Sequence, residues 1–84
     1  MDKPKTIDID LHQYSTIARI TQQFLAPNGG LPVVLLPLGE DRQPMPNRTG
    51  YGCTTQDEFV AALRAIYKLS PCQTARLIPV ERSA

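Results

Sequence analysis

The sequence predicts a small α+β domain, a two-layer sandwich in which two helices cover one face of a three- or four-stranded sheet. Strand-like runs are expected at 6–11, 31–38 and 74–80, and helical periodicity is expected at 13–26 and 55–69. A further short strand at 49–53 completes the order βαββαβ, which is the ferredoxin-like arrangement. Without that strand the chain is a βαβ unit followed by αβ, with three strands. Right-handed crossovers are expected in both cases.

Residues 6–11 alternate apolar and polar, the period-two pattern of a strand with one buried face. Ile7, Ile9 and Leu11 are expected in the core, and Asp8 and Asp10 are expected to face water or a ligand.

The period changes to that of a helix from about residue 13 to residue 26. Asp10 is a candidate N-cap, with Gln13 three residues later as in a capping box. The segment Pro27-Asn28-Gly29-Gly30 predicts the end of this helix, because proline breaks a helix and glycine accepts positive φ.

Two apolar strands contain prolines, which cannot donate to a sheet ladder. Pro37 limits the regular part of the first to 33–36 or places it near an edge, and Pro79 indicates that one side of the strand at 74–80 is unpaired. Either edge could pair with a second copy, so a homodimer is one expected partner state.

The second helix has the clearest boundaries. Thr55 and Glu58 form a capping box, and Ser70-Pro71 ends the helix. Arg64 and Lys68 are expected on its polar side. The opposite side is expected to form an apolar arc, made of Phe59, Val60, Ala62, Leu63, Ile66, Tyr67 and Leu69.

Residues 39–50 are predicted to form a long exposed loop, because they are polar, rich in proline and without periodicity. Loops of this length are often functional. Arg42, Met45 and Arg48 are the expected partner contacts, with Tyr51 beside them, because Arg and Tyr are enriched in interfaces and Met adapts to irregular surfaces.

Composition excludes several classes of protein. The 84 residues suit one domain, and the formal charge of +1 does not indicate a nucleic-acid or membrane partner. No apolar run approaches the length of about 20 residues that spans a bilayer, so a cytoplasmic protein is expected. Residues 1–5 and 82–84 are expected to be flexible ends of the single domain.

No active site can be read from the sequence, and we expect no enzyme activity, cofactor or metal. His12, Cys53 and Cys72 have no ligand spacing. A helix-length separation also argues against a Cys53–Cys72 disulfide. An enzyme would use His12, Asp10 or Cys53, but the simplest interpretation of Cys53 is a small buried residue at the end of a strand.

The stretch Arg48-Thr49-Gly50-Tyr51-Gly52-Cys53 partly resembles the RNP1 motif of RNA-recognition domains. It departs from that motif at Thr49, which is an extra residue, and at Cys53, where an aromatic belongs. The resemblance implies an alternative function, a nucleic-acid-binding module that uses Tyr51 and the basic C-terminal third. That third carries Arg64, Lys68, Arg76 and Arg82 against Glu81.

The expected function is that of a non-enzymatic regulatory or inhibitory protein that binds a protein partner. In size and lack of motifs the chain is similar to phage or mobile-element inhibitors of bacterial defence systems, such as anti-CRISPR proteins. The candidate contact residues are Arg42, Met45, Arg48, Tyr51, Arg64 and Lys68.

Overall fold

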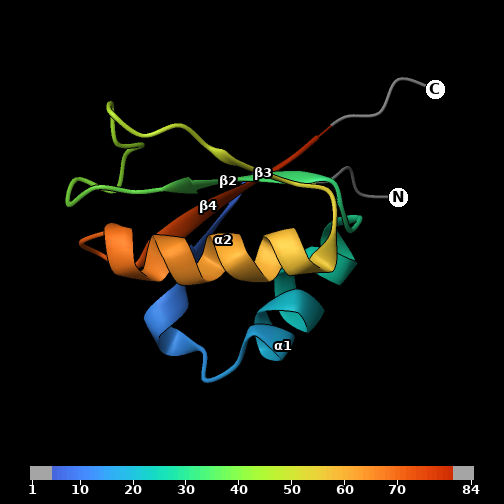
Figure 1. Ribbon diagram of the computed structural model, residues 1–84. Coiled ribbons are helices and arrows are strands. Elements are labelled where there is room, and N and C mark those ends of the chain that lie inside the picture. The colour runs from blue at the N-terminus through green and yellow to red at the C-terminus, as the bar shows by residue number, and fades with distance from the viewer. Residues whose placement is uncertain (1–4, 81–84) are drawn as a thin grey trace.

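Four antiparallel strands form one sheet in the computed structural model, which describes residues 5–80 (Figure 1). The strands are β1 (Ile7–Asp10), β2 (Val33–Pro37), β3 (Tyr51–Cys53) and β4 (Thr74–Pro79). Helical segments lie between β1 and β2 and, as α2 (Gln56–Leu69), between β3 and β4. The predicted α+β class and the short third strand are therefore confirmed. Apart from Lys5, the predicted flexible ends lie outside the described residues.

The strands lie side by side in the order β1-β4-β2-β3, so β1 and β3 form the edges. Both β2 and β4 are central, so the expectation that either is an edge strand is wrong, whereas the expected unpaired side is present locally at Pro79. Their prolines are tolerated because each lies where only one neighbouring strand reaches: Pro37 is beyond Tyr51, where β3 begins, and Pro79 is beyond Ile7, where β1 begins. This strand order does not confirm a ferredoxin-like arrangement or its two-layer packing.

The first helical segment differs most from the prediction. It consists of a 3-10 turn (η1, Leu11–Gln13), a short α-helix (α1, Ile17–Ile20), a π segment (η2, Thr21–Leu25) and a final 3-10 turn (η3, Ala26–Asn28). Thr16, not Asp10, is the N-cap of α1, because its side chain accepts the Arg19 N–H. Tyr14 and Thr16 are extended, so no helix runs on from residue 13.

Helix α2 matches its predicted bounds and cap. Thr55 Oγ1 accepts the Glu58 N–H at 3.2 Å, and Glu58 Oε1 accepts the Thr55 N–H at 3.1 Å. The helix buries Phe59, Ala62, Leu63 and Ile66. The predicted arc is too wide at Tyr67, which is 47% exposed.

The core lies between α2 and one face of the sheet. Ile9, Leu35, Ala75 and Leu77 are fully buried on that face. Figure 1 shows the helical segments on this side of the sheet. The other face carries the residues that alternate with these, including Asp8 and Arg76, which the register places opposite each other.

Candidate functional site

The segment 38–45, which follows β2, forms an ordered hairpin. Leu38 and Pro44 form a β-bridge, and the Gly39 N–H donates to the Gln43 carbonyl at 2.9 Å. The Arg42 N–H donates to the Gly39 carbonyl at 2.9 Å, and Arg42 has φ 62°. A turn followed by a left-handed residue is a common three-residue hairpin loop, but glycine usually occupies that position. We call residues 38–45 the hairpin.

Ionic contacts connect the hairpin to the open face of the sheet, which is the face that α2 does not cover. Arg42 Nη2 lies 2.9 Å from Asp10 Oδ1, which also accepts the Thr74 hydroxyl at 3.0 Å. Arg76 Nη2 donates to the Arg42 carbonyl at 3.3 Å. The Arg76 guanidinium also makes a two-point contact with Asp8, at 2.8 and 3.2 Å. Asp8 is exposed and Asp10 is half-buried, so Asp8 faces water as expected, and both also pair with arginines.

The same contacts perturb the acidity of Asp10. Its pKa is lowered, chiefly because Arg42 donates a hydrogen bond to the carboxylate, while burial opposes that shift. A second contact holds the base of the hairpin, where the buried Ser70 hydroxyl donates to the Leu38 carbonyl. The hairpin is thus fixed from two elements that lie far from it in the sequence.

The predicted contact residues on this loop fall in different settings. Arg42 is used within the protein, although its side chain is 51% exposed. Met45 is half-buried at the base of the hairpin, where its N–H donates to the Pro37 carbonyl at 3.4 Å. Arg48 is exposed, and its N–H donates to the Met45 carbonyl.

Tyr51 does not lie on the open face of the sheet. It pairs with Leu35 in the β2–β3 register and packs, half-buried, against the core. Its ring is therefore on the side that α2 covers. Arg64 and Lys68 are both exposed on α2, as expected for its polar side.

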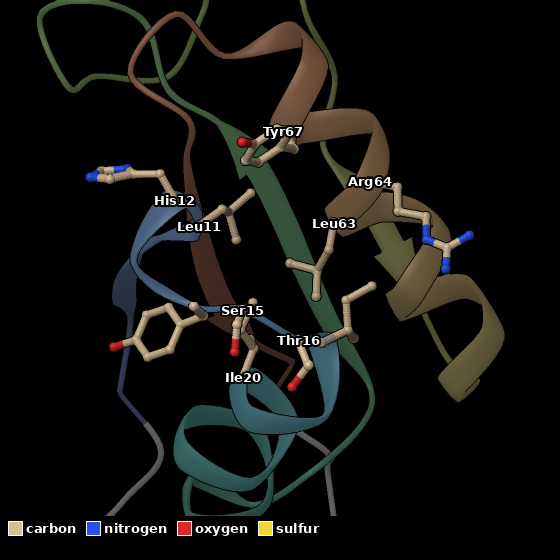
Figure 2. A pocket seen from close by; sticks show the side chains of 10 residues that line it. Leu11, His12, Ser15, Thr16, Ile20, Leu63, Arg64 and Tyr67 are labelled. Atoms are coloured by element: carbon tan, nitrogen blue, oxygen red, sulfur yellow. The ribbon is translucent and has the colours of Figure 1, made fainter.

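A groove separates residues 11–20 from α2. Its volume is about 290 Å³. The buried side chains Leu11, Ile20 and Leu63 contribute to its lining, and Figure 2 shows Leu11 and Leu63 pointing toward each other across it. The other lining residues are His12, Tyr14, Ser15, Thr16, Ile17, Arg64 and Tyr67.

The groove exists because the chain does not continue as a helix from residue 13. The turn η1 contacts α2, and Tyr14 and Thr16, which follow it, are extended before α1 begins. The sequence analysis missed this groove because it assigned residues 13–26 to one helix. The polar pair Ser15-Thr16 could have predicted the later helix start, because serine and threonine favour a helix cap over a helix interior.

The groove and the hairpin belong to the same end of the molecule. Figure 1 shows the loop after β2, the turn between α2 and β4, and η1 at one end of the sheet. Asp10 connects them, because it pairs with Arg42 of the hairpin and directly precedes η1.

The candidate catalytic residues Asp10, His12 and Cys53 lie in different settings. Cys53 is buried, and burial raises the pKa of its thiol, as expected of a structural cysteine. Burial also acts to raise the pKa of the half-buried Cys72, but hydrogen bonds with Ser70 and Thr74 and the charge of Arg42 lower it overall. Both thiols are free. His12 is exposed, and Figure 2 shows it pointing away from the groove.

Within residues 5–80, no three side chains of His, Cys, Asp and Glu lie close enough together to hold a metal ion. In the same range, no helix has the length and apolar character required to cross a membrane.

No protein-family model, curated protein or solved structure matches the chain. The function of the protein is therefore inferred from its own geometry.

Proposed function

We propose that this protein is a non-enzymatic binding protein that acts by occupying a protein partner, with the hairpin and the adjoining Arg48 as its main contact surface. The inhibitory form of this proposal is a phage or mobile-element protein that blocks a bacterial defence complex, as anti-CRISPR proteins do. That form is supported only by the small size of the chain and its lack of catalytic motifs.

The observation that carries the proposal is that the hairpin is exposed and yet held in one shape. Its backbone is closed by two hydrogen bonds of 2.9 Å, and the Arg42–Asp10 pair fixes it to β1. A loop ordered before binding loses less conformational entropy in a complex, which improves affinity for the same contacts. Arg42 closes this hairpin in the left-handed region, which glycine adopts at lower cost.

The nucleic-acid alternative has less support. Base stacking requires an aromatic ring on an accessible face, and it contributes about 1–3 kcal/mol per base. Tyr51 packs on the core side of the sheet, and Arg76 is paired with Asp8. Two elements of the alternative are therefore already engaged within the protein, and Arg82 lies outside the described residues.

The test is capture of the partner from the native host by the tagged full-length chain, followed by reconstitution with the purified partner. Arg48→Glu and Met45→Ser change the contact surface while leaving the Arg42–Asp10 pair intact. We expect the double variant to bind the purified partner at least about tenfold more weakly, as for a residue pair at the centre of an interface.

The matched control is the double variant Gln22→Ala and Gln23→Ala, which changes two exposed residues of η2. It is expected to bind as the wild type does. Equal affinity of the Arg48→Glu, Met45→Ser variant and the wild type, with both folded by circular dichroism, would refute the assignment of this surface.

A further inference from the structure

The groove between residues 11–20 and α2 has an apolar floor, set by Leu11, Ile20 and Leu63, and a polar border that includes Ser15, Thr16 and Arg64. Leu11 and Leu63 are at most 5% exposed, so the floor is set by packed core side chains that require no rearrangement. Tyr67 lies beside them and is 47% exposed, one of the few large apolar side chains that the described residues leave open to solvent. Tyrosine in such a setting is typical of an interface anchor.

The charge of the groove has one sign. Its lining includes the cation Arg64 but neither aspartate nor glutamate. Lys68 follows Arg64 by one helical turn and is also exposed, so two permanent cations share this side of α2. Figure 2 shows Arg64 extending away from Leu11 and Leu63, so its exposed guanidinium belongs to the border of the groove and not to its floor.

Size further restricts the occupant. A volume of about 290 Å³ is at the lower limit of small-molecule pockets, which typically measure about 300–1,000 Å³. The groove can therefore take one or two apolar side chains, while groups attached to them remain at the cationic border. Acidic neighbours of an apolar anchor would meet Arg64 and Lys68, whereas basic neighbours would be repelled.

We infer that this groove binds an acidic peptide segment of a protein partner, which inserts a leucine- or phenylalanine-sized side chain over Leu11 and Leu63 and sets its carboxylates against Arg64 and Lys68. The inference depends on the proposed function, because it supplies the chemistry of a partner segment that the hairpin does not contact.

The test is an amide chemical-shift titration of the isolated full chain with the blocked peptide Glu-Glu-Leu-Phe-Glu-Glu. Two comparison peptides replace all four glutamates by lysine, or replace the central Leu-Phe by Ser-Ser. We expect saturable shifts at residues 11–16 and 63–68 with the first peptide, and at least about fivefold weaker binding with each of the other two.

Variants of exposed residues separate charge from apolar contact. We expect Arg64→Gln and Tyr67→Ala each to weaken the first peptide at least about fivefold. Lys5→Gln, which removes an exposed cation outside the lining of the groove, is expected to leave its affinity within about twofold.

Equal binding of the glutamate and lysine peptides, unchanged binding by Arg64→Gln, or shifts outside the groove would overturn the inference. Shifts at the groove that grow with protein concentration alone would assign it to a second copy of the chain, which also overturns it. None of these results bears on the hairpin, because the peptide titration and the capture by the Arg48→Glu, Met45→Ser variant test different surfaces.

Discussion

Arg42 combines three roles that one residue rarely has. Its backbone adopts φ 62°, its guanidinium pairs with Asp10, and its carbonyl accepts from Arg76. A left-handed conformation costs a non-glycine residue about 1–2 kcal/mol. The pair with Asp10 offsets only part of this cost, because half-exposed pairs contribute about 0.2–1 kcal/mol. The residue is thus strained at the position that closes the hairpin.

This strain predicts a difference between two substitutions of Arg42. Arg42→Gly and Arg42→Ala both remove the ion pair, but only glycine adopts positive φ without steric cost. We expect Arg42→Gly to be more stable than Arg42→Ala by about 1 kcal/mol, or about 4–8 °C in Tm. Thermal unfolding of the two variants measures this, and an alanine variant at least as stable as the glycine variant would show that the left-handed turn is not adopted.

Asp10 predicts a pH dependence of stability. Its pKa is lower in the folded protein than the value of about 3.9 in an unfolded chain, so its ionised form stabilises the fold. That contribution is fully present above the unfolded pKa and is lost as the pH falls through the lower, folded value. The wild type should therefore lose more unfolding free energy between about pH 7 and about pH 3 than Asp10→Asn does.

Urea unfolding at the two pH values measures the loss for each protein. Glu58 also has a lowered pKa, because Thr54 and Thr55 donate to it, but it is present in both proteins and its contribution cancels in the comparison. An equal loss in the wild type and in Asp10→Asn would contradict the role of the Asp10–Arg42 contact.

A helix or strand could be predicted from the sequence where the contacts that fix its ends join residues close together in the chain. The capping box of α2 joins residues three apart, so its start at Gln56 could be predicted. The first helix could not, because Asp10 is occupied by Arg42 and Thr74, which are 32 and 64 residues away. Thr16 is therefore the N-cap in place of Asp10, and the groove lies beside the non-helical part of the segment that was expected to be helical.

The same limit applies to the sheet. Alternation of apolar and polar residues predicted β1 and its buried face, because that pattern is a property of the strand alone. Which strands are central depends on pairing between distant segments. The prolines indicated a locally unpaired side, which is correct at Pro79, but not the central positions of β2 and β4. Residues 40–44 of the hairpin are exposed. The internal pairing of the hairpin was not expected, since Arg42 has no sequence signal for positive φ.

Gly50, which directly precedes β3, lies against β2 on the open face of the sheet, and a substitution there tests this packing. A Cβ added at Gly50 would lie 2.6 Å from Val34 Cγ1 and 2.7 Å from Leu36 Cδ2, whereas one added at Gly52 meets no atom within 4 Å. We expect Gly50→Ala to lower the unfolding free energy by about 1–3 kcal/mol, and Gly52→Ala to change it by less than about 0.5 kcal/mol. Chemical denaturation of both variants decides this, and equal effects would mean that residue 50 does not pack on β2.

In the whole molecule, both proposed contact surfaces, the hairpin and the groove, lie at one end of the sheet. Core packing between α2 and the sheet holds β1 and β4 in register. That register places Asp8 opposite Arg76 and Asp10 opposite Thr74, which positions the ionic contacts of the hairpin. The groove is adjacent to these ionic contacts, because η1 lines the groove and directly follows Asp10. A partner would thus meet a preformed surface rather than a loop that orders on contact.

Amide hydrogen exchange of the free protein tests that claim most directly. The Gly39 and Arg42 amides are the donors that close the hairpin. If the hairpin is ordered without a partner, both should exchange at least about tenfold more slowly than in an unstructured peptide, and Asp10→Asn should speed them. Exchange of both amides at the unstructured rate in the wild type would contradict a preformed contact surface.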